Sequence, residues 1–171
     1  MEGKEKGLLG KIFYGSLLLK LLAGLFIGAV YHFFYQSGDT LALSADSRYL
    51  SELARQEPGN YLHFMLLSDW ERDQHIFRHL HNTNPRAVIF SKYLSLANLL
   101  TFSNYWLNSL LFSLLAFAGT WQLFRTLHRL FPGKTLSLAA AFLLFPSVLV
   151  WTSGVMKESL LAAALGFIIA F

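Results

Sequence analysis

The sequence predicts an all-α protein, a polytopic transmembrane helix bundle with a long external loop that contains short interfacial helices. Three observations support this fold class. Of the 171 residues, 54% are hydrophobic and 14% are charged, whereas about 25% of the residues in soluble domains are charged. The apolar residues form long runs, and about 20 such residues cross a bilayer as a helix. Basic residues flank these runs, where positive charge sets membrane orientation.

The first predicted span covers about 12–35 and follows a short basic tail, 1–11, which we expect to be cytoplasmic. Its apolar stretch, 17–35, exceeds the 7–15 residues of a signal-peptide core and ends in bulky aromatic residues rather than small ones, so it indicates an uncleaved anchor. Lys20 is expected to extend its stem toward the cytoplasmic surface. Gly24 and Gly28 form a small-xxx-small pair, which predicts close helix packing within the protein or with a partner.

The segment 36–104 is predicted to be the external loop, because it contains seven of the ten acidic residues. A short surface helix is expected within 45–56, where apolar residues recur between charges. Pro58-Gly59-Asn60 is typical of a turn. A second interfacial helix is expected over 61–81. The stretch 86–101 is short for a span and contains a lysine, which favours an amphipathic or re-entrant segment.

The rest of the chain is predicted to continue one membrane domain, 1–171, with span 2 at 105–124, a cytoplasmic loop at 125–134, span 3 at 135–151, an external turn at 152–158 and the start of span 4 at 159–171. Pro146 should kink or end the helix of span 3. The basic tail and the basic loop agree on the orientation, with the N-terminus in the cytoplasm. The apolar run still continues at Phe171, so we expect the protein to extend further.

The composition also limits which kinds of binding partner and cofactor site we expect. The sequence predicts an integral protein of the bacterial inner membrane, with the lipid bilayer as a partner and no nucleic acid, since the basic residues flank spans. The chain has no cysteine, which excludes disulfides and thiolate sites. His75 and His79 could share a helical face, but no catalytic metal motif surrounds them, and the nearby arginines would repel a cation. No metal ligand is assigned.

Asp39 follows the first span directly and is the candidate catalytic residue. A carboxylate at a membrane surface can act as a general base, bind a divalent cation or orient a hydroxyl. The sequence Gly38-Asp39-Thr40 is equally typical of a turn or a helix start. Asp46 could contribute to the same site as a substrate-binding residue, or it could cap a helix over 47–56, and capping is the favoured interpretation.

Lys157 and Glu158 are the other candidate substrate-binding residues. They are expected to open the fourth helix, where free amide groups favour anions such as phosphate, and Lys157 would add a positive charge. The alternative is ordinary helix-start chemistry, in which Glu158 complements the helix dipole and Lys157 extends toward the membrane surface.

Two groups of residues resemble a known family. The aromatic-rich first span, then Gly38-Asp39-Thr40 with Tyr49 downstream, resembles the first external loop of the multi-span C-type glycosyltransferases, which include protein mannosyltransferase-like and lipid A sugar-transfer enzymes. The segment Phe145-Pro146-Ser147, with Trp151, Ser153-Gly154 and Lys157-Glu158, resembles a Pro-Ser turn, a Trp-x-Ser-Gly step and a Lys-acid pair found in bacterial membrane proteins of this type and in related polysaccharide-assembly proteins. The resemblance extends loosely over the whole chain.

The resemblance implies sugar transfer from a polyprenyl-phosphate donor to a lipid, glycan or protein acceptor on the outer face. Asp39 would be the matching acidic residue, as a base or as the ligand of a divalent cation, and Lys157 would contact the donor phosphate. Those enzymes usually have eight or more spans, and many have paired acidic residues where this chain has Asp39-Thr40. This chain would therefore be the N-terminal part of such an enzyme.

Two alternatives remain open at this point. One is a polysaccharide polymerase or flippase-type component, which would join or move lipid-linked glycans. The other is a non-enzymatic small membrane subunit, whose segment 36–104 would bind membrane protein partners.

Overall fold

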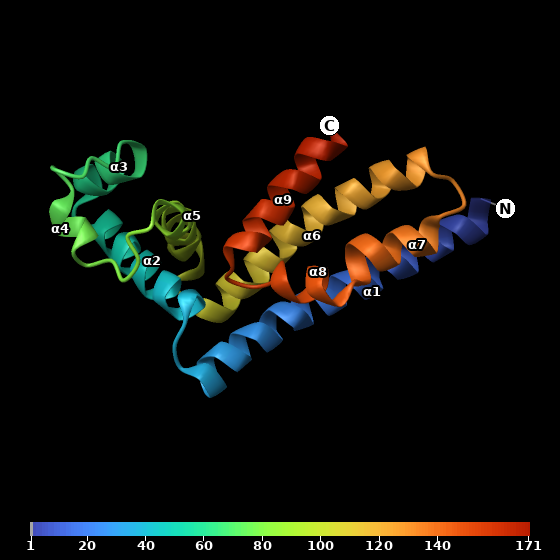
Figure 1. The fold of residues 1–171 in the computed structure, drawn as a ribbon, viewed down its shortest axis with the longest axis horizontal. Coiled ribbons are helices and arrows are strands. Elements are labelled where there is room, and N and C mark those ends of the chain that lie inside the picture. The colour runs from blue at the N-terminus through green and yellow to red at the C-terminus, as the bar shows by residue number, and fades with distance from the viewer. Residues whose placement is uncertain (1) are drawn as a thin grey trace. The chain divides into compact units, whose positions relative to one another are not determined.

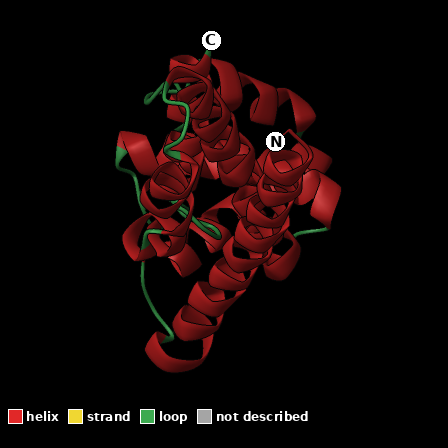
Figure 2. Cartoon of the chain, turned by 90° about the vertical axis from the view of Figure 1, so that its right-hand side faces the viewer, coloured by secondary structure: helices red, strands yellow, loops and turns green. Residues whose placement is uncertain are grey.

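The computed structural model describes residues 2–171, with side chains from residue 7 onward. The side chains of Lys4 and Lys6 in the expected basic tail therefore lie outside the described residues. All regular structure in the described part of the chain is helical (Figure 2), which confirms the all-α prediction. The chain packs as two compact units, one formed by the residues up to 29 together with 109–171 and the other by 30–108.

The α-helices are labelled in Figure 1. In chain order they are α1 (Glu2–Ala29), the π-helix η1 (Val30–Tyr35), α2 (Asp39–Gln56), α3 (Pro58–Leu66), α4 (Gln74–Phe77), α5 (Pro85–Thr101), α6 (Tyr105–Leu130), α7 (Thr135–Ala139), the π-helix η2 (Ala140–Leu144), α8 (Pro146–Trp151) and α9 (Lys157–Ala170).

Two of the described helices are long and apolar enough to cross a membrane, judged by length and composition. They are Gly7–Tyr35, formed by α1 with η1, and Tyr105–Leu130, which is α6. Thr135–Leu144 is a shorter apolar helix. It ends where we expected, because Phe145 is extended (φ −60°, ψ 125°) and Pro146 starts α8. Proline lacks an N–H and disfavours the helical conformation of the residue before it.

Lys20 has a different role from the one expected. Its side chain is buried, and its ammonium donates hydrogen bonds to the carbonyl of Val148 at 3.2 Å and to the hydroxyl of Thr152. Both acceptors lie at the C-terminal end of α8, which runs beside α1 (Figure 1). A cation at a helix C-terminus is stabilised by the negative end of the helix dipole. Lys20 therefore ties α1 to α8 instead of extending to a membrane surface.

The close packing predicted at Gly24 is confirmed. Its carbonyl accepts a hydrogen bond of 2.9 Å from the Ser109 hydroxyl. The amide of Gly154 donates to the Ser113 hydroxyl at 2.8 Å. A Cβ on Gly24 would collide with Ser113 Oγ and lie 3.1 Å from the Gly154 nitrogen. Small residues thus allow α1, α6 and the turn before α9 to approach closely, as is typical of membrane helices.

The second unit is built around α2, which packs against α3 and α5. Its apolar core combines residues from these helices and from α4, namely Leu50, Leu53, Tyr61, Phe64, Ile76, Phe77, Leu80 and Val88. We expected the first helix of this segment within 45–56, but it begins earlier, at Asp39.

Two further expectations for this unit are corrected. Pro58-Gly59-Asn60 is the first turn of α3 rather than a separate turn, because proline is well suited to the first helical position. The expected helix over 61–81 is interrupted after α3. Ser68 has a left-handed φ of 50°, and the Asp69 carboxylate accepts a 3.0 Å hydrogen bond from the amide of Glu71, which is an Asx-turn arrangement.

The stretch 86–101, expected to be amphipathic or re-entrant, lies in one continuous helix, α5. The Asn84 side chain caps it by accepting a 3.1 Å hydrogen bond from the Arg86 amide. Phe102 and Ser103 then adopt left-handed conformations (φ 54° and 58°), which end α5 and leave three residues between it and α6, which begins at Tyr105.

Replacing Gly119 with alanine should lower the thermal stability of the protein in detergent. A Cβ on Gly119 would lie 2.6 Å from Ala163 Cα, within the contact between α6 and α9. Such overpacking costs about 1–3 kcal/mol, which exceeds the gain of roughly 1 kcal/mol in helix propensity. Circular dichroism during heating measures the effect.

Gly10→Ala is the matched control. A Cβ at Gly10 would meet nothing within 4 Å, so the midpoint of thermal unfolding should rise or stay unchanged in this variant. A higher unfolding midpoint in both variants would contradict the close packing of α6 and α9.

Candidate functional site

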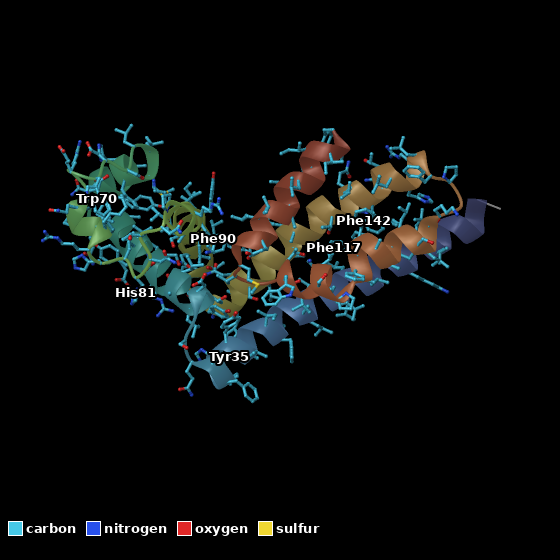
Figure 3. All side chains as sticks on the ribbon, in the orientation of Figure 1. Tyr35, Trp70, His81, Phe90, Phe117 and Phe142 are labelled. Carbon is cyan, nitrogen blue, oxygen red and sulfur yellow. The ribbon has the colours of Figure 1, made fainter. Side chains whose placement is uncertain are left out.

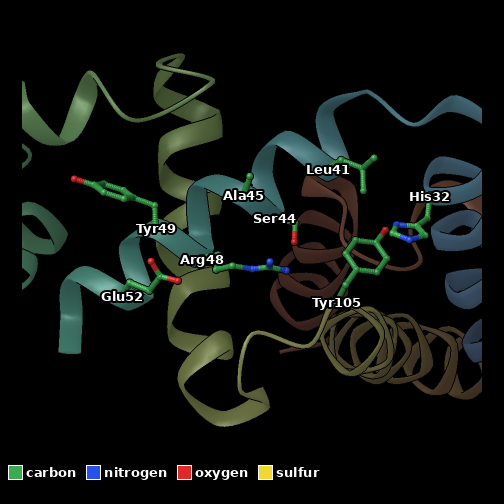
Figure 4. Close-up of a pocket in the computed structure, with 8 residues that line it drawn as sticks. All are labelled: His32, Leu41, Ser44, Ala45, Arg48, Tyr49, Glu52 and Tyr105. Carbon is green, nitrogen blue, oxygen red and sulfur yellow. The ribbon is translucent and has the colours of Figure 1, made fainter. Parts of the chain in front are cut away.

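A cavity of about 420 Å³ lies along one face of α2 (Figure 4). Ser44, Arg48 and Glu52 recur every four residues on this face. The other face of α2 carries Leu43 and Leu50, which are buried in the second unit. Because one turn of helix takes 3.6 residues, the two sets point in different directions. The helix therefore presents an apolar stripe to the core and a polar stripe to the cavity.

Two residues of the cavity wall lie outside α2 and are distant from it in the sequence. His32 lies in η1, near the end of the first candidate membrane-spanning helix, and Tyr105 is the first residue of the second one. Leu41, Ala45 and Tyr49 complete the lining. Each candidate membrane-spanning helix thus contributes one residue from its last or first turn to the same cavity.

Two hydrogen-bond donors in the cavity have no partner among the described side chains. No described carboxylate forms an ion pair with Arg48, whose side chain extends toward Ser44 and Tyr105 (Figure 4). The Tyr105 hydroxyl is buried and makes no hydrogen bond with a described residue. Leaving such a group unpaired costs about 1–3 kcal/mol. A guanidinium and a phenol hydroxyl facing one cavity favour an anion with several acceptor oxygens, such as a phosphate or a carboxylate.

Sequence reasoning did not find this cavity. A signal was present in the spacing of Ser44, Arg48 and Glu52, which places these polar residues on one face of a helix. The positions of His32 and Tyr105 in the cavity wall could not be inferred in this way, because both residues lie outside α2 and only the tertiary structure brings them to it.

Asp39 lies in the first turn of α2 and is exposed. Gly38 precedes it with a φ of 121°, a conformation that favours glycine, so Gly38-Asp39-Thr40 starts a helix. Asp39 lies in line with Leu43 and Asp46 on α2, away from the cavity face, and is absent from the cavity lining. A carboxylate at this end of a helix is stabilised by the free amide groups. Its catalytic role stays a prediction.

Asp46 is buried in the middle of α2, so it does not cap a helix over 47–56 as we favoured. Its carboxylate accepts hydrogen bonds from His81 Nδ1 at 2.8 Å, from the His81 amide at 2.7 Å and from the Asn82 amide at 3.2 Å. Figure 3 labels His81 in the loop before α5. Asp46 therefore fastens this loop to α2. Contact with a substrate stays a prediction, and this arrangement gives it no support.

Lys157 and Glu158 open α9, as the sequence indicated. Glu158 is exposed in the first turn, where its charge complements the helix dipole. Gly154 precedes them with a φ of 74°. Their contact with a substrate stays a prediction.

A second cavity, of about 430 Å³, is mainly apolar, with Trp70, Phe77 and Val88 in its wall. Lys92 also lines it, but its ammonium donates hydrogen bonds to the carbonyls of Phe64 and Met65 and to the Ser68 hydroxyl. Burial lowers the pKa of Lys92, and the nearby Asp73 carboxylate opposes this shift. Because its three N–H groups are used, Lys92 stabilises the end of α3 and has none left for a ligand.

The histidines considered for a metal site have other contacts. The His79 ring stacks on Tyr49 with ring centroids 5.0 Å apart, and its Nδ1 lies 2.8 Å from the His75 carbonyl. In the part of the chain that the structure describes, no group of three His, Cys, Asp or Glu side chains could hold a metal ion.

Comparison with known proteins adds no assignment. No protein-family model, curated protein or solved structure matches this chain. The resemblance to C-type glycosyltransferases therefore rests on the residues quoted above.

Replacing Asp46 with asparagine should lower the stability of the protein by about 1–3 kcal/mol, because an amide nitrogen would face a hydrogen-bond donor in a buried position. Thermal unfolding followed by tryptophan fluorescence measures this change. Glu52→Gln, an exposed substitution on the same helix, should leave the midpoint nearly unchanged. Equal midpoints for the two variants would show that the hydrogen bonds to His81 and Asn82 add no stability.

Proposed function

We propose that this chain is the N-terminal part of a polytopic membrane glycosyltransferase. It transfers a sugar from a polyprenyl-phosphate donor to a lipid, glycan or protein acceptor on the outer face of the bacterial inner membrane. The observation that carries the proposal is the cavity on α2, where the ends of two candidate membrane-spanning helices meet an arginine without an ion-pair partner among the described residues.

The membrane location is supported by the surface of the first candidate span. Only 28% of its most apolar window is buried inside the structure, and large apolar side chains such as Leu18, Leu22 and Phe26 are exposed. Lipid is the solvent that suits such a surface. In this proposal the segments 135–151 and 159–171 contribute further spans, and 36–104 lies outside.

The lipid-linked donor suits the position of the cavity. A polyprenyl phosphate has its charged group at the membrane surface, and the cavity is lined by residues from the ends of both candidate spans. Arg48 would pair with the phosphate in a charge-assisted hydrogen bond, and Tyr105 and Ser44 would donate hydroxyl hydrogen bonds. In this way the protein would hold the leaving group of the transfer reaction.

Two carboxylates are candidates for the base that activates the acceptor hydroxyl. The resemblance implies Asp39, whereas Glu52 lines the cavity itself. Asp39 and Arg48 lie about 13 Å apart along the axis of α2 at a rise of 1.5 Å per residue. Asp39 also lies on the opposite face of α2 from Arg48, so Glu52 is the carboxylate nearer to a donor bound in the cavity.

Asp39→Asn in the complete protein should abolish sugar transfer, because the amide cannot accept the acceptor proton, and the folded protein should persist. Transfer from a polyprenyl-phosphate sugar by purified protein in vesicles is the measurement. Glu52→Gln is the parallel variant. Full transfer by Asp39→Asn together with loss of transfer by Glu52→Gln would assign the base to Glu52. Movement of the lipid-linked sugar with no glycosidic bond formed by the native protein would favour a flippase.

Arg48→Gln should raise the KM for the donor roughly tenfold or more, because a hydrogen bond between charged groups is worth about 1.5–3 kcal/mol. The same transfer assay measures it. Arg72 is an exposed arginine outside the lining of both cavities described above, so Arg72→Gln is the control and should leave KM unchanged. Equal effects of the two substitutions would rule out Arg48 as a specific phosphate ligand.

A further inference from the structure

The helix α5 carries polar residues on its inner face. Ser91, Ser95, Asn98 and Thr101 are at most 9% exposed. Ser95 shares a 2.9 Å hydrogen bond with the Tyr61 hydroxyl, and the Asn98 amide donates to the Ser47 hydroxyl at 3.0 Å. Ser95, Asn98 and Thr101 therefore pair with side chains of α3, α2 and α6, while the Ser91 hydroxyl is buried and makes no hydrogen bond with a described residue.

The outer face of α5 is apolar. Ile89, Tyr93, Leu96 and Leu100 are 54%, 56%, 43% and 77% exposed. Their spacing of four, three and four residues places them in one stripe along the helix. The distribution is the reverse of that on a water-exposed helix, where the outer stripe is polar.

The charges of α5 fit the same arrangement. Arg86 and Lys92 are its charged residues, and it contains no acidic residue. Lys92 turns its ammonium inward to the carbonyls at the end of α3, which leaves the stripe uncharged. Arg86 stands in the first turn, where a basic side chain suits an anionic lipid surface.

In the chain, α5 is followed directly by a candidate membrane-spanning helix, α6. Two left-handed residues, Phe102 and Ser103, separate it from Asn104 and the start of α6, a candidate membrane-spanning helix. Phe102 is itself 83% exposed. If α6 crosses the bilayer, the end of α5 lies within a few residues of the membrane surface.

We infer that the outer face of α5 contacts lipid hydrocarbon, and that its partner is the bilayer. A soluble surface rarely exposes a continuous apolar patch of this kind. In a membrane, polar side chains turn inward to pair with one another and apolar side chains face the lipid. This inference depends on α6 crossing the membrane and is independent of the sugar-transfer chemistry.

The test uses nitroxide labels on single cysteines in the full chain, which has no native cysteine. Tyr93→Cys, Leu96→Cys and Leu100→Cys are labelled and reconstituted into vesicles of phosphatidylcholine and phosphatidylglycerol. Collision of the label with oxygen, which concentrates in hydrocarbon, is compared with collision with a water-soluble nickel chelate. Arg55→Cys and Glu71→Cys, at exposed polar positions of the same unit, are the controls.

The expected result is a high oxygen and a low nickel collision rate at the three α5 positions, with the reverse at both controls. Nickel collision at the α5 positions equal to that at the controls would overturn the inference, because the stripe would then face water. Low collision with both reagents would also overturn it and indicate a protein partner. Circular dichroism of each labelled variant verifies that the helices are retained, which the exposure of these positions predicts.

Discussion

The second unit depends on a buried chain of hydrogen bonds between amide and hydroxyl side chains. Asn108 donates to Asn98 at 2.6 Å, Asn98 donates to Ser47 at 3.0 Å, and Thr101 donates to Asn108 at 2.7 Å. These residues come from α2, α5 and the start of α6, and they are buried. A buried polar network is stable only when its members are paired, so it fixes the rotation of α2. The polar face of α2 is thereby held toward the cavity.

The same network explains why α5 can be apolar on the outside. Ser95, Asn98 and Thr101 of α5 lie inside the unit, where the low dielectric strengthens their hydrogen bonds. The outer face of α5 is then mainly apolar, and its aliphatic side chains form no hydrogen bonds with water. The inward hydrogen bonds of α5 and the apolar character of its outer face are therefore connected. The same hydrogen bonds hold the end of α5, from which the chain turns to Tyr105.

Sequence patterns predict the two long apolar helices and the break at Pro146, because each depends on residues near one another in the chain. The sequence places the start of α2 too late, because Gly38-Asp39-Thr40 is equally typical of a turn and of a helix start. The role of Asp46 was missed because its partner His81 lies 35 residues away, and no local pattern reports such a pairing.

The π-helix η1 determines the direction in which the side chains around it point. In Val30–Tyr35 the backbone winds more widely than in α1, and the Gln36 amide bonds to the carbonyl of Tyr31, five residues earlier. Such a segment arises when one extra residue is accommodated within a helix. Losing that residue would rotate the side chains on one side of it by about 100° relative to the other. A homologue one residue shorter here would therefore present a different residue where His32 now faces the cavity.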